Sequence, residues 1–235
     1  MKNLQDIIQE KLQIGSKTKV SSYKYHPKDK DELGKLIEQL LDERGKDADL
    51  NDIDTSKITD MSDLSDLFNG LDPHNIDISQ WNVSNVENME FMFWNCTNFN
   101  SDLSKWDVSN VRSMKGVFEG CHNFNSDLSN WDISKVTNMK DMFYDCENFE
   151  SDLSKWDVSK VTNTVSMFSQ CEKFNSDLSN WDVSNVNDMT YMFYRCENFN
   201  SDLSKWDVSK NVKMRKMFWK SEIEKNPPKW YINKE

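Results

Sequence analysis

The residues that could do chemistry in this sequence recur every 25 residues. Cysteine can ligate a metal or act as a nucleophile, and it occurs at five equally spaced positions: Cys96, Cys121, Cys146, Cys171 and Cys196. Aspartate follows the same period in two rows: Asp102, Asp127, Asp152, Asp177 and Asp202, and Asp107, Asp132, Asp157, Asp182 and Asp207. Acid–base catalysis needs two groups in different environments, whereas each of these rows repeats one environment.

The cysteine row predicts small buried apolar side chains. Equal spacing favours no particular disulfide pair, and five thiols cannot all pair within one chain. The short C-x-x-C spacing of many zinc sites is also missing from the sequence. We therefore expect reduced cysteines, no bound metal and a reducing compartment.

The aspartate rows allow two interpretations. Stacked carboxylates could bind Ca²⁺, as they do in the glycine-rich repeats of another class of repeat protein. Those loops need tight glycines, and the repeated segment S-D-L-S-x-W-D contains none. The favoured interpretation is that Asp, Ser and Asn side chains bond the backbone at sharp corners, and calcium binding is the alternative.

The rest of the sequence shows no catalytic motif. His26, His74 and His122 share no pattern with a nucleophile or an acid. The sequence has no glycine-rich phosphate loop, no G-x-S-x-G and no H-E-x-x-H. We expect no enzymatic activity and no cofactor.

The elements that must position these rows follow from the period itself. Tryptophan recurs at 25-residue intervals from Trp81 to Trp206, and phenylalanine from Phe68 to Phe218. A fixed period of this length is typical of a solenoid, because propeller blades and helical pairs need about 33 to 50 residues. Each unit should bury its apolar side against the next copy.

Two segments of the unit suggest secondary structure. Met89, Met92, Phe93 and Cys96 have the spacing of one face of a short helix. Trp106 and Val108 flank Asp107, as in an extended strand. The predicted fold is an α/β leucine-rich-repeat-like solenoid of about seven coils, each a short strand plus a short helix.

The ends of the chain differ from the repeat. We predict a helical capping segment over residues 1–49, the array over 50–221 with a degenerate first unit, and a closing segment over 222–235. The first segment should hold a short strand around residues 20–25 and two helices. The apolar residues that mark these helices are Leu4, Ile7, Ile8 and Leu12, and then Leu33, Leu36, Ile37, Leu40 and Leu41, ending near Gly45.

The whole unit, W-D-V-S-N-V-x-N-M-x-x-M-F-x-x-C-x-x-F-N-S-D-L-S, resembles the repeat of bacterial BspA-like leucine-rich-repeat surface proteins. The resemblance covers roughly residues 50 to 221. It implies a leucine-rich-repeat-like fold without known catalytic residues, and a role in binding or adhesion. Many such proteins are exported or anchored by a lipid.

The charge and hydropathy of the sequence limit the classes of partner and the cellular locations that we expect. The net charge is −11, and residues 1–50 hold ten basic and ten acidic residues, so the excess lies in the array. Such a surface should repel nucleic acid and anionic membranes. No apolar run reaches the roughly 18 to 20 residues of a membrane span, and the N-terminus lacks the pattern of a signal peptide. These features predict a cytoplasmic protein, with the cell surface as the alternative if a signal has been removed.

Variation between units points to a contact surface. The S-D-L-S segment is constant in five units, whereas the positions of Phe91 and Trp94 vary freely. A constant scaffold with variable outward positions favours a monomeric module that binds a protein or a glycan. The candidate contact residues are Phe91, Trp94, Tyr144, Tyr191, Tyr194 and Trp219. The alternatives are that these aromatic residues only pack over the neighbouring coil, or that the array is a spacer or scaffold without a specific ligand.

Overall fold

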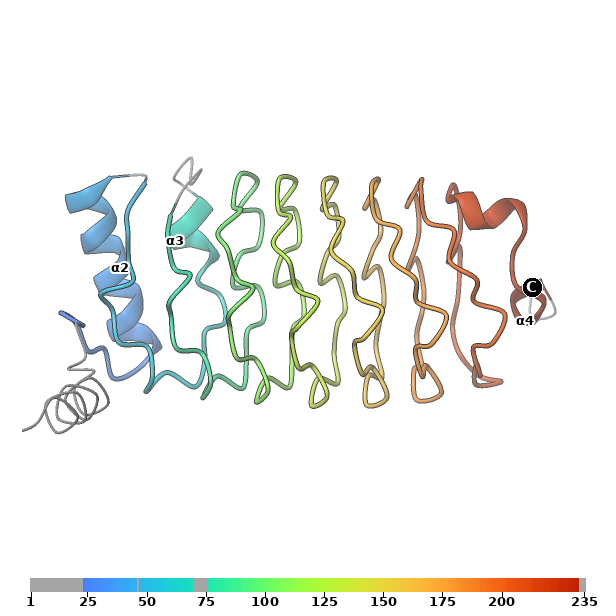
Figure 1. Ribbon diagram of the computed structural model, residues 1–235, viewed down its shortest axis with the longest axis horizontal. Coiled ribbons are helices and arrows are strands. Elements are labelled where there is room, and N and C mark those ends of the chain that lie inside the picture. Colours follow the sequence, from blue (N-terminus) through green and yellow to red (C-terminus); the bar gives the residue numbers. More distant parts are fainter. Residues whose placement is uncertain (1–22, 46, 70–75, 233–235) are drawn as a thin grey trace, which may run out of the picture.

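The computed structural model describes residues 23–45, 47–69 and 76–232. In Figure 1 the chain winds in successive coils that lie side by side along one long axis. Helix α2 (Lys30–Arg44) lies at one end, and helix α3 (Ser65–Asn69) follows it. The 3₁₀-helix η1 (Glu222–Lys225) and helix α4 (Lys229–Ile232) lie at the other end.

The predicted strand and helix of each coil are wrong. Residues 76–221, all of which are described, contain neither an α-helix nor a strand; they form consecutive turns and isolated parallel bridges. One row of bridges joins equivalent residues in successive coils: Asp60, Asn88, Ser113, Asn138, Asn163, Asp188 and Lys213. The prediction of an α/β leucine-rich-repeat-like solenoid is therefore wrong.

The backbone of residues 89–96 shows why no helix forms. Its amides donate alternately to the next coil and to the same coil. Met89 donates to the carbonyl of Ser113 at 3.2 Å, whereas Met92 donates back to the carbonyl of Met89, also at 3.2 Å. Phe93 again reaches the next coil, at the carbonyl of Val117. Because every second amide is used between coils, the continuous i→i−4 bonding of an α-helix is impossible here.

Left-handed backbone accompanies this alternation. Phe91 has φ 55° and Asn95 has φ 56°, and each equivalent residue up to Lys216 and Lys220 also has positive φ. Such residues interrupt a right-handed helix. At Gly116 an added Cβ would lie 2.5 Å from the ring of Phe91, so the position of that ring, and not the conformation alone, favours glycine there.

The apolar rows are buried as predicted, even though the backbone is not helical. Met89, Met92, Phe93 and Cys96 are each at most 1% exposed. The phenylalanine rings of neighbouring coils stack, and the centroids of Phe93 and Phe118 lie 5.7 Å apart. The repeat therefore builds one continuous core from rows of like side chains.

Side chains join the coils where the backbone does not. The indole Nε1 of Trp131 donates to the carbonyl of Leu103 in the preceding coil at 3.0 Å. The amide of Leu103 donates in turn to the Oγ of Ser126 in the following coil at 2.9 Å. Equivalent bonds recur in the next coils for Trp156, Trp181 and Trp206 and for Ser151, Ser176 and Ser201. The constant letters of the repeat are thus the residues that bond coil to coil.

The aspartates turn the corners, which confirms the favoured interpretation of their rows. Oδ1 of Asp102 accepts the amide of Ser104 at 2.9 Å, and Oδ1 of Asp107 accepts the amide of Ser109 at 3.1 Å. The same bonds are made by Asp127, Asp132, Asp152, Asp157, Asp177, Asp182 and Asp202. Hydrogen bonds from the serines lower the pKa of Asp102 and Asp127 below the ordinary value.

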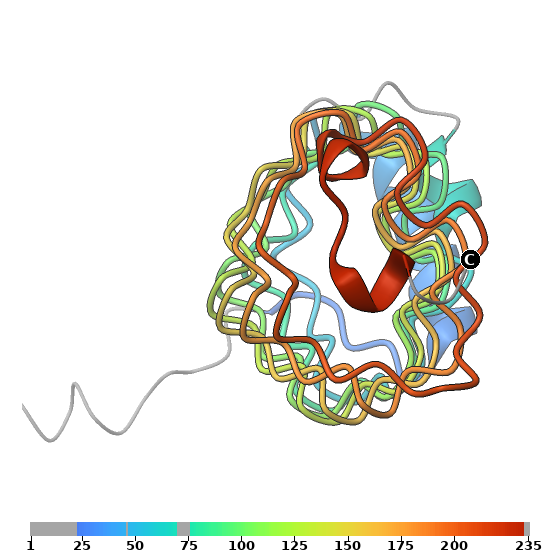
Figure 2. The same cartoon turned by 90° about the vertical axis from the view of Figure 1, so that its right-hand side faces the viewer.

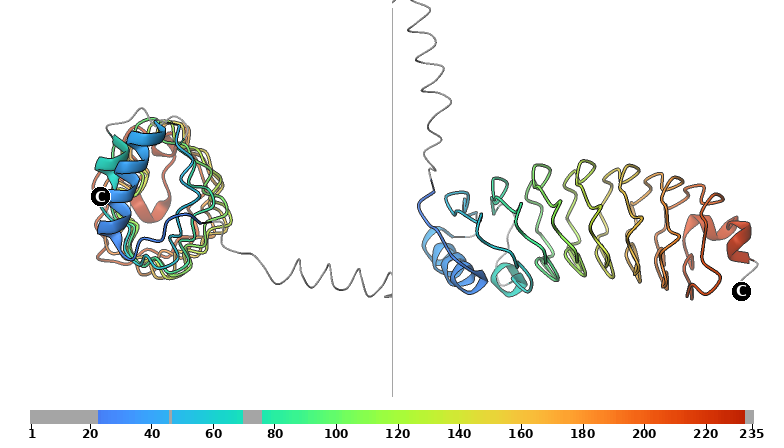
Figure 3. Two further views of the ribbon diagram at one scale, coloured as in Figure 1. Left: turned by 90° about the vertical axis from the view of Figure 1, so that its left-hand side faces the viewer. Right: turned by 90° about the horizontal axis from the view of Figure 1, so that it is seen from below.

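The N-terminal end of the stack carries the predicted helix. Helix α2 begins at Asp29, whose side chain accepts the amide of Glu32, and it ends at Gly45. Its buried residues are Leu33, Ile37, Leu40 and Leu41. Figure 3 shows α2 at this end of the stack, along one side of the outline of the coils. The helix predicted from Leu4 to Leu12 and residues 20–22 of the predicted strand lie outside the described residues, while Tyr25 forms a parallel bridge with Ile53.

The C-terminal segment folds across the opposite end. Figure 2 looks along the stack, and η1 and α4 turn inward over the loop that the coils outline. Ile223 and Tyr231 are buried there. Among the described residues, no helix has the length and apolar character needed to cross a membrane.

Candidate functional site

The six predicted contact residues occupy two rows at the turns between residues 89 and 96 and their equivalents. Trp94 is 40% exposed, and the other five are half-buried. None of these six side chains is in the core. The structure does not form one stripe from them, because the second and fourth coils of these rows carry small or acidic residues instead of aromatic ones.

Three of the six residues surround a recess. Ser166 and Ser169 are buried, at 9% and 2% exposure, and they form its floor. The recess has a volume of about 310 Å³ and is lined by Tyr144, Ser166, Ser169, Tyr191, Tyr194 and Lys216. It exists because Ser169 stands between Tyr144 and Tyr194 in one row, and Ser166 stands before Tyr191 in the other. We call it the tyrosine recess.

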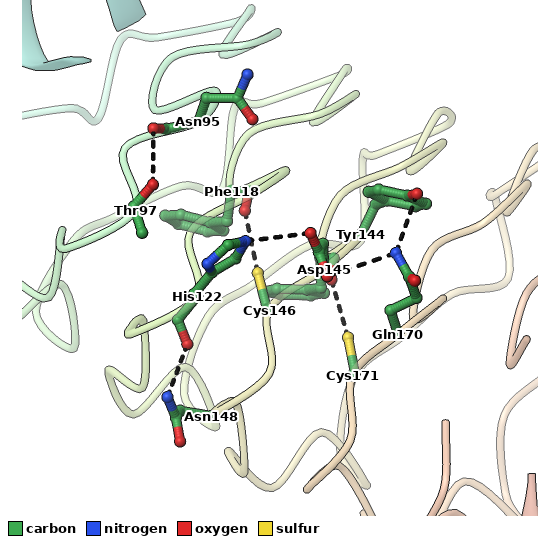
Figure 4. Close-up of polar contacts among 11 residues, drawn as sticks. Asn95, Thr97, Phe118, His122, Tyr144, Asp145, Cys146, Asn148, Gln170 and Cys171 are labelled. Atoms are coloured by element: carbon green, nitrogen blue, oxygen red, sulfur yellow. Dashed lines mark hydrogen bonds and ion pairs between the residues drawn. The ribbon is translucent and has the colours of Figure 1, made fainter. Parts of the chain in front are cut away.

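The walls of the tyrosine recess are held by neighbours. The hydroxyl of Tyr144 accepts a hydrogen bond from Nε2 of Gln170 at 3.0 Å (Figure 4). Tyr191 and Tyr194 meet edge to face, with centroids 5.4 Å apart. Tyr194 also stacks on Trp219 at 4.8 Å. These contacts fix the rings and thereby lower the entropic cost of binding a partner.

Trp219 supports the ring of Tyr194 from outside the tyrosine recess. Its ring is covered by the ammonium group of Lys220, 4.5 Å from the centroid, and by that of Lys216 at 5.4 Å. It packs against Tyr194 and does not line the recess. For Trp219 the packing alternative therefore describes the geometry better than direct contact.

The remaining two residues lie near the N-terminal end of the stack. Phe91 and Trp94 line a separate hollow of about 340 Å³ together with Asp63, Ser65 and Asp66. The ring of Phe91 lies over Gly116 of the next coil and beneath the ammonium group of Lys115, 4.8 Å from the centroid. Phe91 thus packs over its neighbour, while Trp94 is the more exposed of the pair.

Negative charge lies between these two hollows. Loss of solvent, followed by the charge of Asp141, raises the pKa of Glu119. The pKa of Tyr144 is raised for the same first reason, and then by the charges of Asp145 and Glu119. This side of the tyrosine recess therefore favours cationic or neutral groups over anionic ones.

The cysteines belong to the core and not to a site. All five are free and buried. Sγ of Cys121 donates to the carbonyl of Phe93 at 3.0 Å, and Sγ of Cys146 donates to that of Phe118 at 3.0 Å. Burial raises the pKa of Cys96 to about 12, and it raises the pKa of the other four thiols further. A neutral, bonded thiol is a poor nucleophile.

The two serines that form the floor were not among the residues predicted from the sequence. Large outward residues are conspicuous in the repeat, whereas a recess also needs small residues between them. The signal was present: Ser166 and Ser169 are the small polar members of rows that hold Tyr191 and Tyr194 one coil later.

Comparison with known proteins gives a family. The family model described as "Mycoplasma protein of unknown function, DUF285" matches the chain twice, over residues 36–144 and 113–230. No curated protein and no solved structure matches the chain. Because the two matches span most of the sequence, the chain belongs to this bacterial repeat family.

Proposed function

We propose that this member of the DUF285 family is a non-enzymatic binding module that takes a protein or glycan group into the tyrosine recess. The observation that carries the proposal is the pair of buried serines between tyrosine-bearing coils, which opens about 310 Å³ beside Tyr144, Tyr191 and Tyr194. Tyrosine is favoured at contact surfaces because it offers a large rigid ring with a polar tip.

The resemblance of the 25-residue unit to the repeat of BspA-like surface proteins supports a role in binding or adhesion. It concerns the repeat sequence and not the leucine-rich-repeat architecture. Constant residues supply the contacts between coils, and variable residues line the recess. A spacer without a ligand has no use for a recess made by variation, and this difference favours binding over the scaffold alternative.

A single substitution tests the proposal. Ser169→Tyr fills the floor with a side chain that the same row already accepts at Tyr144 and Tyr194. The stacking of Tyr194 on Trp219 shows that adjacent coils can both carry aromatic residues in this row. The matched control is Asn130→Tyr, which places the same side chain at an exposed position that does not line the recess and leaves the floor open.

Binding is measured on a glycan array and on a peptide library displayed at the same density. The expected result is a ligand that the wild type and Asn130→Tyr bind equally and that Ser169→Tyr binds at least about tenfold more weakly. Equal binding by Ser169→Tyr, or no ligand on either array, would favour the scaffold alternative.

A further inference from the structure

One cluster of metal-ligating side chains lies outside the tyrosine recess. Nε2 of His122 lies 3.1 Å from Oδ2 of Asp145 in the next coil (Figure 4). Glu147 completes the group, and one ligand atom from each of the three residues lies within 4.8 Å of the others. We infer that His122, Asp145 and Glu147 bind a divalent transition-metal ion.

The three residues depart from the repeat at one place. The row of His122 holds Thr97 in the coil before and glutamates in the coils after, beginning with Glu147. Asp145 stands in a row whose other members carry no carboxylate. Stacking the coils therefore brings an imidazole and two carboxylates together only where these particular substitutions coincide, among the residues that the structure describes.

The backbone holds each ligand in place before any ion arrives. The carbonyl of His122 accepts both the amide and the Nδ2 of Asn148 in the next coil, at 3.2 and 2.9 Å. The amide of Asp145 donates to the carbonyl of Ser169 at 2.8 Å, and its φ is 61°. The carbonyl of Glu147 accepts the amide of Lys173. All three Cα positions are thus fixed by bonds between coils.

The negative charge of Asp145 and Glu147 also suits a bound cation. In the part of the chain that the structure describes, no lysine or arginine forms an ion pair with Asp145 or Glu147. Two carboxylates and an imidazole therefore face one another with no fixed positive charge to neutralise them. A divalent ion supplies that charge.

The geometry fits ordinary bond lengths after a small adjustment. Zinc binds imidazole nitrogen and carboxylate oxygen at about 2.0 to 2.2 Å, so ligand atoms on one ion lie at most about 4.2 Å apart. The 3.1 Å between His122 and Asp145 already falls in this range. Glu147 is exposed, and rotation of its side chain can close the remaining distance.

The ligand chemistry selects the class of ion. Imidazole favours transition metals, whereas carboxylates and water alone suit Mg²⁺ and Ca²⁺. Asp145 is oriented on its other side, because Nε2 of Gln170 lies 3.4 Å from Oδ1. Gln170 thus orients the carboxylate of Asp145 without being a ligand itself, and contacts of this kind commonly tune metal affinity. The remaining coordination positions stay open to water or to a ligand from a partner.

Zinc binding to the metal-free full chain tests the inference by calorimetry. The ligand variants are His122→Thr, which uses the residue of the preceding coil, together with Asp145→Asn and Glu147→Gln. Glu197→Gln is the matched control, because Glu197 is in the row of Glu147 but has no histidine in the coil before it. His26→Gln is a second control, since His26 forms a comparable pair with Asp54, also at 3.1 Å, without a third ligand among the residues that the structure describes.

The expected result is one Zn²⁺ per chain, weakened by about tenfold or more in each ligand variant and unchanged in both controls. The nitrogen resonance of Nε2 in His122 should shift on addition of Zn²⁺, a readout that stability changes would not produce. Circular dichroism identifies any variant that fails to fold, and His122→Thr, which the row already accepts, then decides the question. No saturable binding, equal binding by His122→Thr, or equal affinity for Mg²⁺ would each overturn the site.

Discussion

The indole Nε1 of Trp230 donates to the carbonyl of Leu203 at 2.7 Å, which is the bond that Trp206 makes with Leu178 one coil earlier at 2.9 Å. The two indole rings stack with centroids 6.1 Å apart and an angle of 12° between their planes. Trp230 stands one residue short of the 25-residue period, yet the short helix α4 returns its ring to the row. The C-terminal segment therefore extends the tryptophan row beyond the last full coil.

We expect Trp230→Phe to lower the free energy of unfolding by about 1 kcal/mol, because it removes the donor and keeps most of the ring. Trp230→Ala should cost about 2 kcal/mol or more, since the stacking on Trp206 is lost as well. Urea unfolding measures both changes. The control is Ile232→Ala, at a side chain 57% exposed, where little change is expected. Equal effects of Trp230→Phe and Ile232→Ala would show that the indole bond contributes nothing.

Substitutions at Arg195 test the left-handed turns. Arg195 is exposed and has φ 55°. Glycine is at ease in this conformation, whereas a β-branched residue is strained by about 1 to 2 kcal/mol. Arg195→Val should therefore unfold at a lower urea concentration than the wild type, and Arg195→Gly should be at least as stable as Arg195→Lys. If valine and lysine are equivalent here, the turn is not left-handed in solution.

The cysteine row predicts slow chemistry in the native protein. Burial raises the pKa of Cys96 to about 12, so almost none of this thiol is thiolate near neutral pH, and the native protein should react slowly with a disulfide reagent. In denaturant at the same pH all five thiols should react quickly, because each regains the lower pKa of an ordinary exposed cysteine. Absorbance of the released thiol follows both reactions. Rapid modification of the native protein would place at least one thiol outside the core.

The aspartate corners should make the protein sensitive to acid. Asp102, Asp127, Asp152, Asp177 and Asp202 all have a lowered pKa in the folded state, and hydrogen bonds from the serine two residues later are the main cause. An aspartate whose pKa is lowered in the folded state stabilises the fold at pH values above its unfolded pKa of about 4. That stability is lost as the pH falls through the lower pKa of the folded state.

Replacing these five aspartates by asparagine should flatten the loss of stability between about pH 5 and pH 2, because asparagine keeps an acceptor and does not titrate. Asn82 already plays this part at a corner, accepting the amide of Ser84 at 3.1 Å. Thermal unfolding across this pH range gives the comparison, and the matched alanine variant should be destabilised at every pH. An unchanged acid profile in the asparagine variant would assign the acid sensitivity to other groups.

The sequence predicted burial well and backbone conformation poorly, and residues 89–96 show the reason. Spacing of i, i+3, i+4 and i+7 identifies which side chains share a face. Overlapping four-residue turns with left-handed residues at Phe91 and Asn95 place the same side chains inward as a helix would. The absence of Val, Ile and Thr from those two rows was the available clue.

The candidate sites were predictable only in part for a related reason. Outward aromatic residues can be recognised one at a time, whereas a recess depends on what stands in the neighbouring coil. Ser166 and Ser169 form the floor of a recess only because Tyr144 stands on one side of them and Tyr191 and Tyr194 stand on the other. His122 likewise has no motif along the chain, because its partner Asp145 lies 23 residues away and meets it only through stacking.

The equal spacing of the coils means that distances along the stack change in steps of one coil. Neighbouring phenylalanine rings in the core are 5.7 Å apart at Phe93 and Phe118, and again at Phe118 and Phe143. Inserting or deleting one whole unit between Trp94 and Tyr144 would move the hollow beside Trp94 away from or toward the tyrosine recess by one such step. The separation of the two hollows is thus set by the number of units between them, while each hollow keeps its own lining.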